Sequence, residues 1–357
     1  MNATIEPTAS LPEPAARIAG ARPYRPPDPA PDGALRLDAN EGPAPSRVLA
    51  EWIASRAPEI FRRYPDASSL EAQLASRFDV DPARVLVTAG ADEAIQRLAL
   101  AMLEPGRAAT TTTPTFEMIG RAVRLAGADL REIPWMDGPL PIEAVADAAA
   151  GSAVTFAVTP NNPTGSVIGI DDLLKLADAT GLLVADLAYA EYAAEDPTKA
   201  LLDRPNTLVL RTLSKAWGLA GLRVGYAVGP AEVIEAMRAA GGPYTVSAPS
   251  LAIAEDWLSA GAMRVRNHVQ RVRAERAELT ALLAELGAGP LPSEANFVLA
   301  RFADAAGAHA ALRNFGVHVR AFAAPPLRDC LRITCPGDRG DFIRLCRALR
   351  AALEDRP

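Results

Sequence analysis

A lysine lies in a segment of small residues where its amine could reach a ligand. Lys215 follows Ser214 within the segment 212–223, directly after an apolar stretch. An amine flanked by small residues at a strand end can enter a cleft without steric obstruction. Arg223, eight residues later, offers a planar fork of N–H donors that suits phosphate. Taken alone, the segment fits a surface loop with an ordinary lysine equally well.

Two other polar side chains follow apolar stretches. Asn162 lies in the turn 159–165, which follows the apolar run 154–158. Asp186 follows the run 182–185, and a carboxylate at the carboxyl end of a buried strand points into the crevice where α/β sheets bind ligands. Simple strand termination would also explain the turn, and a helix-capping role would also explain the carboxylate.

The segment 88–93 could hold an anion through its backbone. It contains Gly90 and lies between the apolar run 85–87 and a helical stretch at 94–103. Small residues let the backbone approach a phosphate, and a helix N-terminus offers N–H groups that have no partner within the helix. Asp92 could also cap this helix, and the two roles are compatible.

These side chains need a framework that brings strand ends together, and the sequence predicts one. From about residue 85 short apolar runs alternate with amphipathic helical stretches, such as the one that places Ile95, Leu98 and Met102 at helical spacing. Continuous apolar strands are expected in a parallel sheet covered by helices on both faces. The pattern therefore predicts an α/β fold.

The pattern changes after about residue 250. A long charged helical stretch runs to about residue 286, and a solvated face explains its arginines better than a nucleic-acid site does. Three β-type segments follow around Phe297, Val319 and Ile333, and then a closing helix. The arginines are Arg264, Arg266, Arg271 and Arg273, and the apolar side of the closing helix holds Phe342, Leu345, Cys346 and Leu349.

We therefore expect three parts. Residues 1–34 form a Pro/Ala-rich arm, and ordered structure begins near Leu35. Residues 35–250 form a large domain with a mostly parallel sheet, whose first residues could pack with the small domain. Residues 251–357 form a smaller α+β domain.

Composition excludes several classes of function. The net charge of −6 and the pI near 5.3 give no electrostatic reason to expect nucleic acid or an anionic membrane as a partner. No apolar run is long enough to cross a membrane, and no secretory signal is visible, so a cytoplasmic protein is expected. Cys330, Cys335 and Cys346 lack the spacing of a disulfide framework or a metal site and are expected to be buried thiols.

Together these segments resemble the fold-type-I, pyridoxal 5′-phosphate (PLP)-dependent aminotransferases of class I/II, and within them the histidinol-phosphate aminotransferases. The resemblance runs from about Leu35 to the C-terminus, and the order and spacing of its motifs are specific. Besides segments 88–93, 159–165, 186–189 and 212–223, the matching motifs are Asp38-Ala39-Asn40-Glu41, Arg63-Tyr64-Pro65-Asp66, Thr113-Pro114-Thr115-Phe116, Pro243-Tyr244, Pro292-Ser293-Glu294-Ala295-Asn296-Phe297 and Leu331-Arg332-Ile333-Thr334.

The resemblance implies a role for each residue. Lys215 would bind PLP as a Schiff base and later move the substrate's proton. Asp186 would pair with the pyridine nitrogen and keep it protonated. Arg332 would anchor the acidic group beside the substrate's Cα, with help from Arg320. The remaining implied contacts are Asn162 and Tyr189 to the 3-oxygen, Phe116 to the ring face, Ala91, Asp92, Ser214 and Arg223 to the phosphate, Tyr64 to the phosphate of the neighbouring subunit in a homodimer, and Asn40 to the substrate.

The sequence also departs from the family pattern. The usual Asn-Glu-Asn-Pro-aromatic-Gly reads Asn40-Glu41-Gly42-Pro43-Ala44-Pro45, so an aromatic that helps enclose the substrate is absent. Phe116 replaces a common tyrosine, and Leu187 follows Asp186 where glutamate is common. None of these changes removes PLP chemistry, but the first weakens the case for an imidazole-phosphate substrate.

Several functions therefore stay open. The leading hypothesis is transamination of histidinol phosphate with 2-oxoglutarate in histidine biosynthesis. The alternatives within the fold are an aromatic or other amino-acid aminotransferase and a threonine-phosphate decarboxylase. A PLP-binding transcription regulator is disfavoured because the arm is too short for a DNA-binding domain. A catalytically inactive paralogue is disfavoured because Lys215, Asp186, Asn162 and Arg223 are all present.

Overall fold

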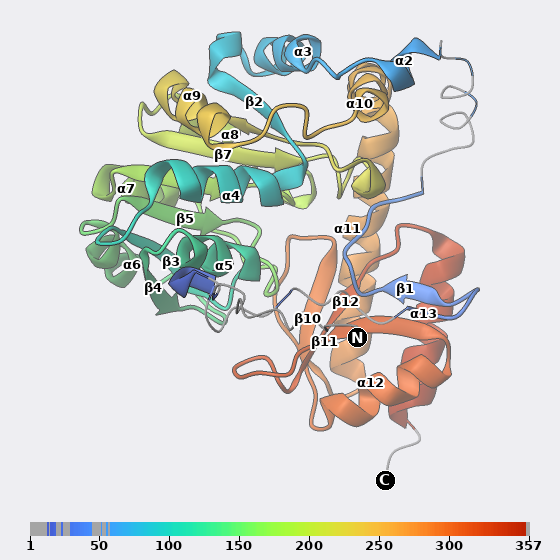
Figure 1. The fold of residues 1–357 in the computed structure, drawn as a ribbon. Helices are drawn as coiled ribbons and strands as arrows, with labels where there is room; N and C mark the ends of the chain where they lie inside the picture. Colours follow the sequence, from blue (N-terminus) through green and yellow to red (C-terminus); the bar gives the residue numbers. More distant parts are fainter. Residues whose placement is uncertain are drawn as a thin grey trace, which may run out of the picture.

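Two sheets organise the chain, and a long helix lies between them (Figure 1). The computed structural model describes residues 29–44 and 58–354, together with residues 13, 15–18, 23, 51 and 55. In these residues the strands of the large sheet lie in the order β2-β8-β7-β6-β5-β3-β4. In that order the strands are Val85–Thr88, Gly225–Val228, Thr207–Thr212, Leu182–Asp186, Val154–Val158, Ala108–Thr113 and Asp129–Pro134.

The large sheet is parallel except at β8, which runs antiparallel to both β2 and β7. Alternate residues of its strands enter two separate apolar clusters. Leu182 and Val184 pack with helices α4, α5 and α9, whereas Leu183 and Ala185 face the opposite side. The sequence prediction of a parallel sheet covered on both faces is confirmed. The helices are α3 (Ser68–Phe78), α4 (Gly90–Met102), α5 (Glu117–Leu125), α6 (Ile142–Ala149), α7 (Ile170–Ala179), α8 (Thr198–Leu202) and α9 (Ala231–Ala240).

The second sheet is built mostly from the C-terminal part of the chain. Its strand order is β1-β11-β12-β10-β9, and β1 pairs in parallel with β11. From β1 in this sheet the chain crosses to the large sheet after residue 37, and it returns to the second sheet after α11. The strands are β1 (Leu35–Leu37), β9 (Gly289–Pro290), β10 (Phe297–Arg301), β11 (Val317–Ala321) and β12 (Cys330–Thr334), and the helices are α12 (Ala305–Asn314) and α13 (Arg339–Glu354).

The charged stretch after residue 250 is two helices, whereas the sequence suggested one. Helix α10 (Ala248–Ala260) packs against α3, and α11 (Ala262–Glu285) begins after Gly261 and runs toward the second sheet. The four arginines predicted to be solvated are all exposed, and two of them also donate to backbone carbonyls. Arg271 donates to Gly337 O at 2.9 Å and Arg273 to Tyr192 O at 3.0 Å. These bonds tie α11 to both parts of the molecule.

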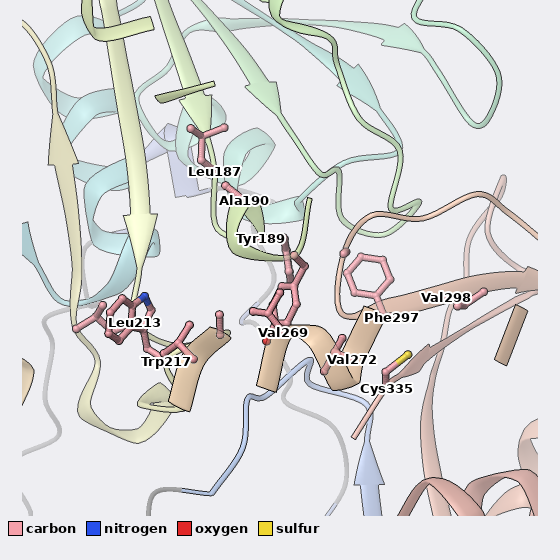
Figure 2. Close-up of a cluster of buried hydrophobic side chains, with 14 of the residues drawn as sticks. Leu187, Tyr189, Ala190, Leu213, Trp217, Val269, Val272, Phe297, Val298 and Cys335 are labelled. Carbon is pink, nitrogen blue, oxygen red and sulfur yellow. The ribbon is translucent and has the colours of Figure 1, made fainter. Parts of the chain in front are cut away.

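One apolar core runs from the loops of the large sheet across α11 to the second sheet. Figure 2 shows Trp217 at the left, Tyr189 in the centre above Val269 and Val272 of α11, and Phe297 beside Tyr189 at the right. The edge of the Tyr189 ring meets the Phe297 ring at 90°, with the ring centroids 5.3 Å apart. Because the core is continuous, the two sheets hold a fixed relation at their junction.

The ends of the chain differ in part from expectation. A short 3-10 turn, Ala16–Ile18, lies against α5, so ordered structure begins before Leu35. Most of the predicted arm falls outside the described residues. Cys330 and Cys335 are buried and Cys346 is partly buried, as predicted for thiols in a core. None of the helices in the described part combines the length and the hydropathy that a membrane span requires.

A glycine in β8 sets how closely α4 approaches the large sheet. A Cβ atom on Gly225 would lie 2.5 Å from the carbonyl carbon of Gly90 and 2.7 Å from the nitrogen of Ala91. Both neighbours are backbone atoms, so they cannot rotate away. The N-terminus of α4 can therefore reach its place beside β8 only if position 225 has no side chain.

We predict that Gly225→Ala lowers the free energy of unfolding by roughly 1–3 kcal/mol, because the added methyl overpacks a backbone contact. Urea unfolding followed by circular dichroism would measure the change. Gly221→Ala is the matched control, since a Cβ atom there meets nothing within 4 Å. Equal unfolding midpoints for the two variants would contradict the proposed close approach.

Candidate functional site

A cavity of about 630 Å³ opens at the carboxyl ends of β5, β6 and β7, facing β11 and β12. This is the position in which open α/β sheets bind ligands. The cavity brings together every site residue predicted from the sequence except Tyr64. The predicted residues that line it are Asn40, Ala91, Asp92, Phe116, Asn162, Asp186, Tyr189, Ser214, Lys215, Arg223, Arg320 and Arg332.

Lys215 enters this cavity from the turn after β7. Its Nζ atom donates to the carbonyl oxygen of Ala39 at 3.1 Å and lies 5.7 Å from the centroid of the Tyr189 ring. Its own carbonyl accepts from the N–H of Gly218, which has a φ of +70°. The glycine thus closes the turn that presents the lysine.

Asp186 ends strand β6 and is 3% exposed. Burial raises the pKa of its carboxyl to about 6, and the nearby charge of Asp92 adds to this effect. The N–H of Ala188, which donates to Asp186 Oδ1 at 3.1 Å, and the charge of Lys215 both lower the pKa. A buried carboxylate facing a cavity is suited to pair with a cationic ring nitrogen.

Asn162 and Arg332 meet across the cavity. The Arg332 Nη1 atom donates to Asn162 Oδ1 at 2.5 Å, and Nη2 donates to the carbonyl oxygen of Asp38 at 2.8 Å. Arg332 is 7% exposed, and its guanidinium lies 5.3 Å from the centroid of the Phe297 ring. A side chain of the second sheet therefore holds the amide that follows β5.

An anion-binding cradle lies at the start of α4. The first N–H groups of a helix have no partner within it, and the helix dipole favours negative charge there. Arg223 approaches this end so closely that a Cβ atom on Gly90 would lie 2.6 Å from its Nη2 atom. Arg223 Nη1 is 3.5 Å from Ser214 Oγ. This donor set fits a phosphate group.

Asp92 does not cap α4. The N-cap residue is Ala89, which has no side-chain cap bond, and the Asp92 carboxylate instead pairs with Arg223 at 3.1 Å. Both side chains are about half exposed, so the pair is weak and an incoming phosphate could compete for the guanidinium. Asp92 was considered both as a helix cap and as part of a backbone anion site, and only the backbone role is still possible.

Two arginines stand side by side on neighbouring strands. Arg320 of β11 and Arg332 of β12 are register partners in an antiparallel pair, so their side chains share one face of the sheet. Both line the cavity. Arg320 takes part in none of the ion pairs among the described residues, and its guanidinium lies 6.0 Å from the centroid of the Phe322 ring. The alternative of a local ion pair for Arg320 is therefore not supported.

Tyr64 lies outside the cavity of its own chain. Its side chain is 81% exposed and stacks on Tyr244, with centroids 4.7 Å apart. Tyr244 is also exposed and has a φ of +63°. A role for Tyr64 in this site would require a second copy of the chain.

Sequence reasoning missed several residues of the cavity. Ala39 and Asp38 act through backbone carbonyls, which no side-chain pattern reveals. Phe322 lies just after β11, two positions from Arg320, a spacing that gives residues of one strand the same face. That signal could have found Phe322. Other cavity residues that were missed are Glu41, Glu117, Met118 and Leu327.

The comparisons with known proteins agree with this geometry. Residues 32–349 match the family model of aminotransferase class I and II. The histidinol-phosphate aminotransferase from Paracoccus denitrificans is 36% identical to this chain, and the match covers 91% of each protein. The histidinol-phosphate aminotransferase from Xanthomonas euvesicatoria is 38% identical, and the match covers 85% of this chain and 86% of that protein. A crystal structure of the Sinorhizobium meliloti histidinol-phosphate aminotransferase in complex with PLP superimposes with a TM-score of 0.80 at 27% identity, over 90% of this chain and 91% of that one. The chain belongs to the class I and II aminotransferases, with their fold-type-I architecture.

Proposed function

We propose that this aminotransferase transfers the amino group of histidinol phosphate to 2-oxoglutarate, with PLP bound at Lys215. The observation that carries the substrate assignment is the pair Arg320 and Arg332, which face one cavity together with Lys215. A single carboxylate is usually satisfied by one bidentate arginine. A phosphate has more acceptor oxygens and more charge, so a second arginine is useful.

The cavity residues divide into two groups around the proposed cofactor. The N-terminus of α4, through the backbone of Ala91 and Asp92, would hold the phosphate together with Ser214 and Arg223. Phe116 would cover one face of the ring. Asn162 and Tyr189 would donate to the 3-oxygen of the ring, and Asn162 is already oriented for this because Arg332 holds its oxygen and leaves its Nδ2 free to turn toward the ring.

Two side chains would carry the chemistry. PLP, when bound, supplies an electron sink for the bond broken at the substrate's Cα. Asp186 would hold the proton on the pyridine nitrogen, and its burial strengthens that pairing. The Lys215 amine, displaced by the substrate amine, would move the proton at Cα as a general base and then as a general acid. Because Lys215 lies in the turn after β7 and lines the cavity, it can bind the cofactor and move the proton without leaving the cavity.

We propose further that the enzyme works as a cytoplasmic homodimer. Tyr64 supports this, because an exposed tyrosine stacked on a second exposed tyrosine presents an aromatic surface that a partner subunit would cover. In such a dimer the Tyr64 hydroxyl would reach the phosphate bound by the partner subunit.

A second candidate substrate is an aromatic amino acid. Met118, Phe322 and Leu327 give the cavity an apolar wall that suits a benzene or phenol ring as well as an imidazole. An aromatic amino acid, however, has one carboxylate and leaves one of the two arginines without an anionic partner.

Replacement of Asp186 tests its pairing role. Because burial raises the folded-state pKa to about 6 from 3.8, the ionised carboxylate destabilises the cofactor-free protein once the pH rises through this window. We predict that Asp186→Asn stabilises the cofactor-free protein at pH 8 by roughly 2–3 kcal/mol and that this gain disappears below about pH 4. Thermal unfolding across this pH range measures it.

The same variant should bind PLP yet lose roughly 100-fold or more in turnover, because a neutral amide cannot stabilise a protonated pyridine. Asp147→Asn, on the exposed side of α6, is the control and should change neither property. Near-normal turnover of Asp186→Asn would contradict the role of this carboxylate.

The substrate assignment is tested by removing one arginine. We predict that Arg320→Ala raises KM for histidinol phosphate by roughly 10- to 100-fold, the loss of one charge-assisted contact, while the absorbance of bound PLP is unchanged. Steady-state kinetics measure this change. Arg328→Ala is the matched control, since Arg328 is exposed and bonds only Ala323 O among the contacts in the described structure. A wild-type preference for phenylalanine or tyrosine over histidinol phosphate in kcat/KM would favour the second candidate instead.

A further inference from the structure

Asn40 lines the cavity, but its side chain is committed to protein partners. It is 1% exposed and lies directly beside the site. Its Nδ2 atom donates to the hydroxyl oxygen of Tyr189 at 2.9 Å, and its Oδ1 atom is 2.9 Å from the hydroxyl of Thr334. Little of this amide is left to contact a substrate, which is the role the sequence suggested for it.

The backbone at this position also favours asparagine. Asn40 has a φ of +55°, in the left-handed region that asparagine and glycine tolerate best. Its carbonyl accepts a hydrogen bond from Asn296 Nδ2 at 3.2 Å. The residue is therefore fixed on both sides, by Thr334 at the end of β12 and by Asn296 just before β10.

The bond to Tyr189 constrains the phenol proton. A tyrosine hydroxyl has one proton to donate and lone pairs that accept. Because Asn40 donates to the oxygen, the phenol proton must point elsewhere, and Tyr189 lines the cavity that Lys215 enters. An asparagine behind the tyrosine thus leaves its proton available for an acceptor within the site.

From this geometry we propose that Asn40 is a positioning residue that directs the Tyr189 proton toward the 3-oxygen of bound PLP. The inference rests on the proposed function, because it assumes PLP in the cavity. A hydrogen bond donated to the 3-oxygen draws negative charge away from the Schiff-base nitrogen beside it, which then holds its proton less tightly. Asn40 would therefore help set the pH at which the cofactor changes colour.

The test is a pH titration of the cofactor absorbance in four proteins. These are the wild type, Asn40→Gly, Tyr189→Phe and the double variant. Glycine keeps the left-handed backbone and removes only the side chain. We expect the midpoint of Asn40→Gly to rise by about 0.5–1 pH unit, the size expected for one hydrogen bond. In the Tyr189→Phe background, the same substitution should cause no further rise.

Each other outcome is also informative. A fall of the midpoint in Asn40→Gly would mean that the amide accepts the Tyr189 proton, and an unchanged midpoint would mean that it has no effect; either result overturns the proposal. An equal rise with and without the tyrosine hydroxyl would show a structural effect that does not pass through Tyr189, and would also overturn it. Asn206→Ala, which removes a partly buried amide bonded to Ala177 O and Thr180 O, is the control for general loosening and should leave the midpoint unchanged.

Asn40→Asp provides a second variant of nearly the same size, in case the glycine weakens folding. Its carboxylate would accept the phenol proton and turn it away from the cavity, so the midpoint should rise more with Tyr189 present than with phenylalanine there. An equal rise in both backgrounds would overturn the proposal. A wild-type protein without a titrating band would contradict the proposed function itself, which distinguishes that failure from the failure of this inference.

Discussion

The guanidinium of Arg332 joins the two sheets at the point where the site is built. It extends from β12, holds the amide of Asn162 after β5 at 2.5 Å, and holds the carbonyl of Asp38 at 2.8 Å. Because this cation is buried, losing either of these two hydrogen bonds would be costly. The relative position of the sheets is therefore coupled to the arrangement of the site, and the same arginine that would bind substrate first organises the groups around it.

The segment that crosses between the sheets completes this arrangement. After β1 the chain lines the cavity and forms hydrogen bonds with three functional side chains in succession. The carbonyl of Asp38 accepts from Arg332, the carbonyl of Ala39 accepts from Lys215, and the side-chain amide of Asn40 donates to Tyr189. Gly42 packs against the turn that holds Lys215 so closely that a Cβ atom on Gly42 would overlap the carbonyl oxygen of Lys215. The departure from the family motif at position 42 thus removes a side chain for which this chain has no room.

Much of this site could be predicted from sequence because strand ends are local features. An apolar run followed by Asp186 or by the Lys215 turn marks the end of a strand, and parallel strands bring such ends to one edge. The resemblance to a known family then supplied their roles. What sequence could not show depends on contacts between distant segments: the register that pairs Arg320 with Arg332, the carbonyls of the crossing segment, and the commitment of Asn40 to Tyr189. The break at Gly261 was missed because both flanking stretches are strongly helical.

The central claim is that Lys215 is the residue to which the cofactor is attached, and one chemical measurement tests it directly. The chain has only three lysines, Lys175, Lys199 and Lys215. Lys175 pairs with Glu143 on the surface, and Lys199 lies exposed on α8, so both are accessible to solvent and serve as internal controls. Borohydride reduction of the PLP-loaded protein followed by peptide mapping should place the pyridoxyl group on Lys215 alone. A label on Lys175 or Lys199, with Lys215 unmodified, would contradict the account.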